Sequence, residues 1–206
     1  PGKNDSDDLT GGGVSTDALI ALVNNARESI VIQTPYLVTT ELGEAVFRAA
    51  EERGVDVRIL TNSLAATDNI MAFSGYKRGR DGLLDAGVEL YESKPKMAVQ
   101  TELMNGPLAA RYGSAMALHA KSMVVDGRIS VVGSFNLDPR SANLNTESIT
   151  IIHSESVAKH LLDLMETEMT EDNAWRRTEA YNPDKHARLF RRFRVFLSGF
   201  VPLSIL

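Results

Sequence analysis

The chain has 206 residues, of which 43% are hydrophobic and 24% charged, which fits one globular domain or one half of a larger pseudo-symmetric one. This composition excludes intrinsic disorder and a collagen-like architecture. The sequence contains no cysteine, which excludes disulfides, thiolate zinc sites and cysteine nucleophiles.

The charge is spread unevenly along the chain. The formal net charge is −5, but Lys185 to Leu206 carries five Lys or Arg and no acid, so the rest of the chain is more acidic. An acidic body argues against a general duplex-DNA binder, whose affinity depends on a basic surface, and makes nucleic acid an unlikely partner. The apolar stretches are much shorter than the roughly 20 residues of a membrane-spanning helix. We therefore expect a cytoplasmic protein or a peripheral membrane protein.

The first half of the chain alternates between helical and extended patterns. Residues 1–14 contain a triple glycine and several Asp, which predicts a flexible leader. A helix is expected over 15–27, capped by Ser15, Thr16 or Asp17, and further helices over 41–53 and 68–86. Short strands are expected at 30–32, 55–60 and 88–91. This alternation predicts parallel crossover units.

The second half is richer in strands. Residues 94–114 predict a long surface loop, followed by strands at 117–126 and 129–134 about an Asp126-Gly127-Arg128 turn. A strand at 148–153 and a helix at 155–169 complete a layered α/β domain over 15–170. The remainder, 171–206, is predicted as a C-terminal extension with a basic amphipathic helix from Lys185 to Phe200. That helix could lie on an anionic membrane surface, or pack on the domain or on a missing half.

The chemistry is concentrated between His119 and Asn136. In a strand, His119 and Lys121 point to the same face about 7 Å apart, which suits a phosphate group. The returning strand ends at Gly133, which permits close backbone approach, followed by Ser134 and Asn136, which can donate a hydroxyl and an amide hydrogen. A neutral imidazole can attack phosphorus to form a phosphohistidine, so no metal or other cofactor is required.

Two acidic residues complete this pattern. Glu147, near the start of the next strand, could accept the second ring N–H of His119 and fix its tautomer. Asp126 lies in the predicted turn between the two strands. We expect Glu147 to act with His119 and Lys121 in catalysis, and Lys121, Ser134 and Asn136 to bind the substrate phosphate.

The spacing His119-x-Lys121-x4-Asp126-x6-Gly133-Ser134-x-Asn136 resembles the HKD signature of the phospholipase D superfamily. The continuation from Phe135 to Ser141 and from Leu144 to Glu147 is similar to bacterial cardiolipin synthases, most of all to the C-terminal half of the C-type enzymes. The resemblance implies an α-β-α sandwich with a mixed sheet. It also implies that Asp126 and Gly133 are structural residues and that His119 is the nucleophile or its acid partner.

Enzymes of this type carry two such motifs, and this sequence has one. No second His-x-Lys occurs, because Glu155, Leu162 and Arg188 stand two residues after the other three histidines. In-line displacement needs a nucleophile on one side of phosphorus and an acid on the other. We therefore expect a second half, either from the same longer chain or from a second copy in a homodimer.

The resemblance implies a phosphatidyl transferase of phospholipid biosynthesis. Its substrate would be phosphatidylglycerol or a similar phospholipid, at the cytoplasmic side of the bacterial membrane. Two alternatives stay open. The first is a phosphodiesterase of the same chemistry that uses water as acceptor and acts on lipid or nucleic acid. The second is an inactive isolated half that binds phosphate or a partner chain.

Overall fold

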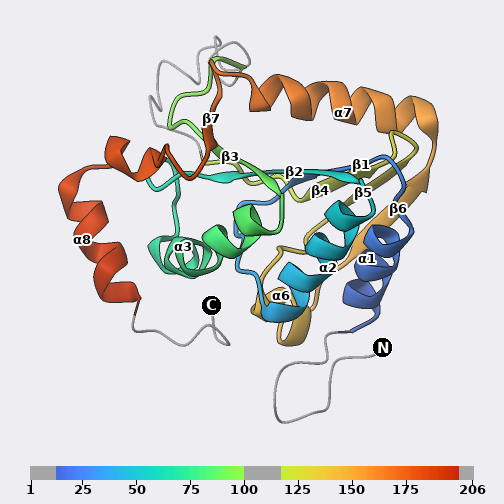
Figure 1. Cartoon of the computed structure of the whole chain (residues 1–206), viewed down its shortest axis with the longest axis horizontal. Coiled ribbons are helices and arrows are strands. Elements are labelled where there is room, and N and C mark those ends of the chain that lie inside the picture. The colour runs from blue at the N-terminus through green and yellow to red at the C-terminus, as the bar shows by residue number, and fades with distance from the viewer. Residues whose placement is uncertain (1–12, 100–116, 200–206) are drawn as a thin grey trace.

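The computed structural model describes residues 13–99 and 117–199 and shows a seven-stranded sheet covered by helices on both faces (Figure 1). The strand order is β6-β5-β4-β1-β2-β3-β7. The strands are β1 (Ser29–Gln33), β2 (Asp56–Asn62), β3 (Glu89–Ser93), β4 (Ser122–Val125), β5 (Ile129–Gly133), β6 (Ile149–His153) and β7 (Ala174–Arg177). Strands β1, β2 and β3 are parallel, and the other pairings are antiparallel. The expected α-β-α sandwich with a mixed sheet is confirmed.

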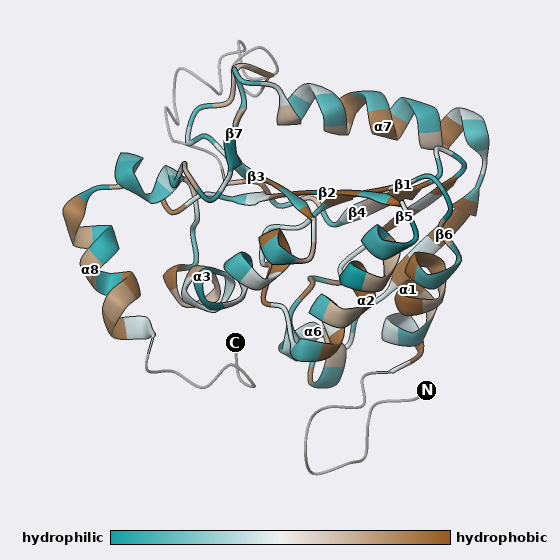
Figure 2. Ribbon diagram, viewed as in Figure 1, coloured by the Kyte–Doolittle hydropathy of each residue, from teal (hydrophilic) through white to brown (hydrophobic). Residues whose placement is uncertain are grey.

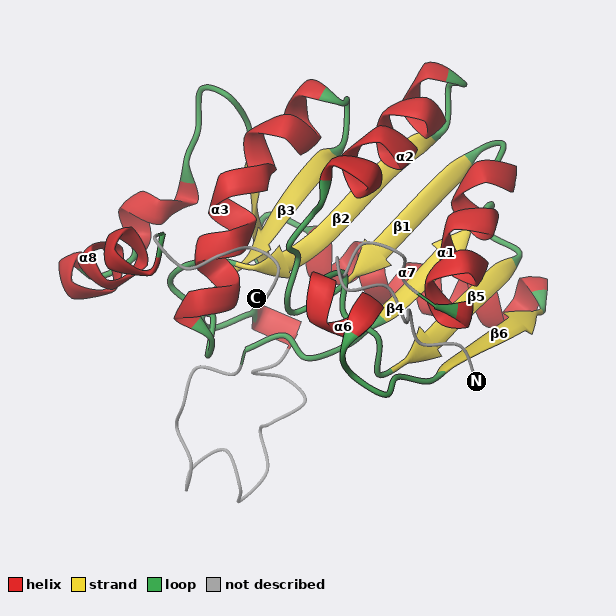
Figure 3. Cartoon of the chain, turned by 90° about the horizontal axis from the view of Figure 1, so that it is seen from below, coloured by secondary structure: helices red, strands yellow, loops and turns green. Residues whose placement is uncertain are grey.

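The helices divide between the two faces of the sheet. Helices α1 (Val14–Asn25), α2 (Glu41–Glu52), α3 (Ile70–Asp85) and α6 (Pro139–Asn143) cover one face, and α7 (Glu155–Met169) covers the other (Figures 1 and 3). A 3-10 turn, η1 (Pro183–His186), leads to α8 (Leu189–Ser198), which packs beside α3. Within the described ranges, no helix combines the length and apolar character needed to cross a bilayer.

Period-two alternation of the strands separates two cores. Ile30 and Ile32 of β1 face α1, α2 and α3, whereas Val31 between them faces α7, where it packs with Met165. Side chains of β2 divide in the same way, with Ile59 toward the first core and Leu60 toward the second. Both faces of the central strands are therefore buried, as expected for parallel strands with helices on each side.

Most predicted elements lie within two residues of their expected bounds, and the differences have physical causes. Helix α1 begins at Val14 with Gly13 as its N-cap, where Asp17 N–H donates to the Gly13 carbonyl, so the predicted cap at Ser15 to Asp17 is wrong. The rest of the predicted leader lies outside the described residues, as does most of the predicted loop 94–114. The segment 171–206 contributes β7, an edge strand of the same sheet.

Candidate active site

The site residues gather at the edge of the sheet where β1 and β2 end and β4 begins. The predicted strand over 117–126 starts only at Ser122, so His119 and Lys121 precede the strand, and the period-two argument for their shared face does not apply. The cause is Asn62 at the end of β2. Its side-chain amide donates to the Leu118 carbonyl and accepts from the Leu118 N–H, both at 2.9 Å. The buried Asn62 side chain thus makes the two hydrogen bonds to Leu118 that a neighbouring strand would otherwise make.

His119 is exposed at this edge and contacts an aromatic ring. The centroids of the His119 and Tyr36 rings are 6.3 Å apart in an edge-on arrangement. The Tyr36 hydroxyl donates to both carboxylate oxygens of Asp68 at 3.2 Å. Burial, reinforced by the Asp68 charge, raises the pKa of Tyr36, so this hydroxyl keeps its proton. The exposed imidazole therefore lies beside a tyrosine that an acid holds in place. We call the region formed by His119, Lys121, Ser134, Asn136 and Glu147 the mouth.

Lys121 points its ammonium group into the same region. Its Nζ donates to the His119 carbonyl at 2.9 Å. Burial lowers the pKa of Lys121, while the nearby charges of Glu147, Asp68 and Asp138 oppose this shift. The charges of three carboxylates thus act on one partly buried cation, and an arriving phosphate would compete with them for the same ammonium.

Gly133 brings two backbones unusually close together. A Cβ at this position would lie 2.1 Å from the Ser148 carbonyl oxygen, so only glycine fits. The next residue, Ser134, donates its N–H to that carbonyl at 3.0 Å, and the Ser134 hydroxyl accepts from Ser148 N–H at 3.1 Å. The predicted close backbone approach at Gly133 is thus made by Ser148, just before β6. This contact fixes the position of Ser134 at the mouth.

Glu147 is the centre of a hydrogen-bond network of short polar side chains. Its carboxylate accepts from the Ser134 hydroxyl, from Asn145 Nδ2 at 3.1 Å and from the Ser141 hydroxyl at 3.3 Å. Among the described residues, the hydrogen bonds of Glu147 thus go to Ser134, Ser141 and Asn145. The predicted hydrogen bond from His119 to Glu147 stays a prediction.

Asn136 is buried beneath this network. Its backbone N–H donates to the Ser141 hydroxyl at 3.2 Å and its Nδ2 approaches the same oxygen at 3.5 Å, whereas Oδ1 is buried and unpaired among the described residues. Rotating the amide exchanges its donor and acceptor ends without changing its shape. One end of this buried amide is therefore left without a hydrogen-bond partner among the described residues.

Asp126 lies at the other end of β4, away from the mouth. It occupies the left-handed region with φ of 51° in the turn to β5, and its carboxylate accepts from the backbone N–H groups of Arg27, Glu28 and Ser29 at 2.8–3.1 Å. These hydrogen bonds lower the pKa of Asp126, although burial opposes them. Its contacts join the β4–β5 turn to the start of β1, which is the position of a structural residue.

A cavity of about 620 Å³ lies between α1, α2, α6 and the sheet, and Lys121 and Gly133 belong to its wall. Most of its lining is apolar and includes Leu19, Val23, Phe47, Met123, Phe135 and Ile149. Its volume lies within the range of small-molecule sites. The polar mouth and an apolar interior therefore meet at Lys121.

Comparison with known proteins assigns this arrangement to a family. Residues 19–169 match the family model described as "Cardiolipin synthase, PLD-like domain". The chain belongs to this phospholipase D-like family. It is 40% identical over 157 residues to cardiolipin synthase C of Escherichia coli (strain K12), an alignment that covers 76% of this chain and 33% of that protein. It is 30% identical over 182 residues to cardiolipin synthase A of Pectobacterium carotovorum, covering 88% and 33% respectively.

The phospholipase D-like chain spans about a third of the length of these curated relatives. Two solved structures share its fold. Nuc of Salmonella typhimurium superposes with a TM-score of 0.58 at 19% identity, covering 82% of this chain and 94% of that one. Phosphatidylserine synthase of Haemophilus influenzae superposes with a TM-score of 0.61 at 14% identity, covering 95% and 46%. The expected family and fold are thus confirmed.

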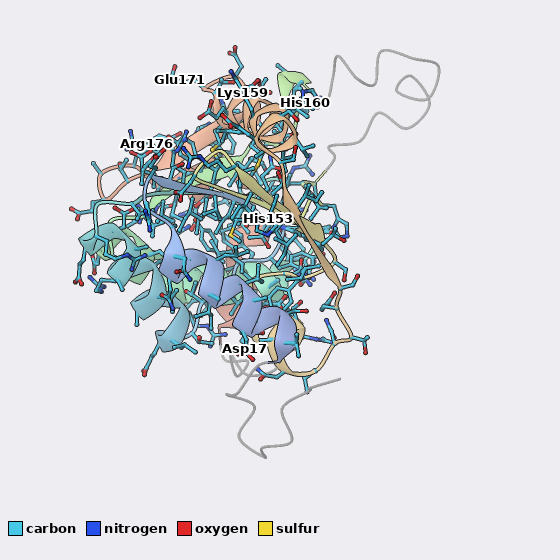
Figure 4. All side chains as sticks on the ribbon, turned by 90° about the vertical axis from the view of Figure 1, so that its right-hand side faces the viewer. Asp17, His153, Lys159, His160, Glu171 and Arg176 are labelled. Carbon is cyan, nitrogen blue, oxygen red and sulfur yellow. The ribbon has the colours of Figure 1, made fainter. Side chains whose placement is uncertain are left out.

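The other histidines of this phospholipase D-like domain lie away from the mouth. His153 ends β6 and pairs with Ile129, at the opposite end of that strand from the Ile149–Gly133 pair. His160 lies on α7, across the sheet from the cavity (Figure 4). His186 stacks on Trp175 with ring centroids 4.4 Å apart. None of these imidazoles can serve as the acid opposite His119 within one copy of the described fold.

Three residues beside the predicted site, Tyr36, Asp68 and Ser141, are not among the predicted catalytic or phosphate-binding residues. Tyr36 and Asp68 are 32 positions apart and meet because parallel strands end at one edge of the sheet. Ser141 is buried in α6, a five-residue helix that the sequence pattern did not predict. The Asp-Pro pair at 138–139 was the available signal, because Asp138 caps α6 by accepting from Ser141 N–H at 2.7 Å.

Proposed function

We propose that this domain is half of a phosphatidyl transferase of the cardiolipin synthase type, with His119 as its nucleophile. The observation that carries this proposal is the position of Lys121, which joins a polar mouth suited to phosphate to an apolar cavity. A phosphate group with an apolar body fits both parts, whereas a nucleic acid backbone would use only the mouth. The names of the curated relatives, cardiolipin synthases, agree with a phospholipid substrate.

The first step of the proposed reaction forms a phosphatidyl-histidine. A ring nitrogen of His119 bonds to phosphorus, the ester bond to the headgroup alcohol breaks, and the alcohol leaves with a proton from an acid on the far side. Lys121, Ser134 and the free end of the Asn136 amide hold the nonbridging oxygens. Such positioned donors are typically worth about 3–4 kcal/mol each in the transition state.

The second step releases the product. The hydroxyl of a second lipid, such as phosphatidylglycerol, gives its proton to the group that acted as the acid in the first step and attacks phosphorus, and the phosphorus–nitrogen bond breaks. Glu147 keeps Ser134 oriented until the substrate arrives, when the single hydroxyl hydrogen of Ser134 turns from Glu147 to a nonbridging oxygen. We also propose that it receives the second ring N–H of a histidine, either His119 or its counterpart in the other half.

The acid of the first step comes from a second half of the enzyme. The described fold offers no second imidazole at the mouth, and the chain spans only about a third of its curated relatives. The second half is either a preceding part of a longer chain or a second copy related by a two-fold axis. Because both substrates are phospholipids, we place the enzyme peripherally on the cytoplasmic side of a bacterial membrane.

The decisive test is to trap the covalent intermediate. The chain is incubated with phosphate-labelled phosphatidylglycerol and quenched, and we expect an acid-labile adduct that His119→Ala abolishes. His160→Ala, on the exposed surface of α7, is the matched control and should retain the adduct. An adduct that survives His119→Ala, or no adduct in a preparation that contains the second half as well, would overturn the proposal.

Lipid products and mass measurements decide the finer points. Transfer yields cardiolipin, whereas a hydrolase that uses water yields phosphatidic acid. Light scattering under turnover conditions tests the requirement for a second half, because a monomer with full activity would contradict it.

A further inference from the structure

Helix α8 directs an apolar surface away from the protein. Leu189, Phe190, Phe193 and Leu197 are between 51% and 78% exposed. At about 100° per residue these four side chains share an arc of about 100°, and Val195, which is buried, lies on the opposite side. We call these four residues the α8 apolar arc. Figure 2 shows the mixture of hydrophobic and hydrophilic positions along α8.

The helix is held firmly in this orientation. Arg191 Nη1 donates to the carbonyls of Leu64, Ala65 and Thr67 at 2.9–3.1 Å. The Ser74 hydroxyl on α3 donates to the Ser198 carbonyl at 3.3 Å, and Val195 packs into the core of the α3 face. The inward side of α8 is thus fully engaged with the domain. The outward arc is a contiguous exposed apolar patch of the kind that marks an interaction surface.

Cations flank the apolar arc on both sides. Arg194 lies next to one border of the arc on the helical wheel, and Arg192 lies on the other side, beyond the exposed Phe196. Arg192 also lines a pocket of about 330 Å³ together with Lys77 and Lys185. Asp184 is the acidic residue of that lining, but its carboxylate is already bound by both terminal nitrogens of Arg80 at 2.9 and 3.0 Å. Asp184 therefore neutralises none of the three cations, although Lys185 Nζ already lies 4.0 Å from the centroid of the Tyr181 ring.

We propose that the α8 apolar arc and this basic pocket form a docking surface for an anionic phospholipid bilayer. The aromatic side chains enter the boundary between headgroups and acyl chains, and Lys77, Lys185 and Arg192 bind the phosphate of a headgroup. Apolar side chains bordered by Lys and Arg are the composition of interfacial membrane helices. A symmetric contact between two copies through this patch would instead bring like charges together.

The docking surface is connected to the active-site mouth. Arg191 binds the loop between β2 and α3 at Thr67, and the adjacent Asp68 binds the Tyr36 hydroxyl beside His119. A chain of contacts therefore joins α8 to the side chains beside His119. The inference rests on the proposed function only in what membrane binding is for, because binding of the vesicle through α8 does not need His119.

The test is co-sedimentation of the full chain with vesicles of phosphatidylcholine alone or mixed with phosphatidylglycerol. We expect binding to the mixed vesicles that weakens with salt. The double variant Phe190→Ser/Phe193→Ser should lose at least tenfold in partitioning, since each buried aromatic contributes strongly. Lys77→Gln and Arg192→Gln should each lose about fivefold, on the mixed vesicles only.

A matched control removes exposed apolar residues elsewhere. Val157→Ser/Leu164→Ser on α7, where these side chains are 43% and 51% exposed, should bind as the unsubstituted chain does. Equal sedimentation of the α8 and α7 double variants, with circular dichroism showing both folded, would overturn the inference. A change in the mass of the α8 variant by light scattering with unchanged vesicle binding would also overturn it, and would assign the arc to a protein contact.

Failure of the docking surface and of the proposed function can be told apart. Vesicle binding should survive His119→Ala. If the chain forms the phosphohistidine adduct with a short-chain, water-soluble phosphatidylglycerol but does not bind vesicles, only the docking surface is wrong. If it binds vesicles through α8 and forms no adduct even when the second half is present, only the proposed function is wrong.

Discussion

Two glutamates of this domain, Glu147 and Glu92, show what different surroundings make of the same carboxylate. Glu147 is half-buried at the mouth, and its partners are neutral groups of Ser134, Ser141 and Asn145. Glu92 on β3 is fully buried, where it accepts from the Tyr76 hydroxyl at 3.0 Å and forms an ion pair with Arg80 at 3.4 Å.

The difference separates chemistry from stability. Neutral hydroxyl and amide donors can exchange one acceptor for another at little cost, so the Glu147 network can adapt to an incoming phosphate. A buried ion pair cannot be opened without leaving a charge unpaired. We therefore expect changes around Glu92 to affect folding and changes at the mouth to affect turnover, and the following predictions test that division.

The largest effect on stability is expected for Arg80→Met. Arg80 is 3% exposed and bridges Glu92 to Asp184, which joins α3, β3 and η1. Removing it leaves two buried carboxylates without their cation and should lower the free energy of unfolding by about 3–5 kcal/mol. The matched control is Arg176→Met, whose ion pair with Glu89 is largely exposed and should be worth about 0–1 kcal/mol. Similar urea midpoints for the two variants would contradict this assignment.

At the mouth, Lys121→Met should reduce turnover about a hundredfold to a thousandfold, because it removes the cation that we propose binds the phosphate. Stability should change by no more than about 1 kcal/mol, since burial of the ammonium already works against its charge. Lys159→Met on the exposed surface of α7 (Figure 4) is the control and should retain full activity. Steady-state kinetics with thermal unfolding of both variants measures the split. Loss of folding in Lys121→Met would place this lysine with the structural residues.

The same contrast explains what could be predicted from the sequence. The β-branched run at 30–32 and the helical spacing over 155–169 are local signals, and both elements occur as predicted. The residue types from His119 to Asn136 were also readable because their spacing is fixed along one stretch of chain. The start of β4 at Ser122, after His119, could not be predicted in this way. It depends on Asn62, which lies 56 residues before Leu118 and holds it through its side chain.

Residues that meet only through topology were also beyond reach. Arg80, Glu92 and Asp184 lie on three elements, and no periodicity relates them. The outward orientation of the α8 apolar arc depends likewise on Arg191 and Val195 engaging the loop after β2 and the core. An amphipathic pattern alone leaves open whether its apolar side faces the domain or the solvent.

The smallest effect is the pH dependence carried by Glu92. Burial raises its pKa from the ordinary value of 4.5 to about 7, against the opposing charge of Arg80. A carboxyl whose pKa is higher in the fold stabilises it fully below the unfolded value and loses that contribution as the pH rises through the folded value. The unsubstituted chain should therefore lose up to about 3 kcal/mol of unfolding free energy between about pH 4.5 and 7.

Glu92→Gln should flatten this slope, because the neutral amide keeps the shape of the side chain without its titration. Urea unfolding at a series of pH values measures the difference between the two chains. The lowered pKa of Asp126 acts in the opposite direction and below pH 3.8, outside this window. A slope that persists in Glu92→Gln would assign the titration to another buried acid, such as Glu168, whose pKa burial also raises. The charge of Glu92 would then no longer explain the difference between Glu92 and Glu147.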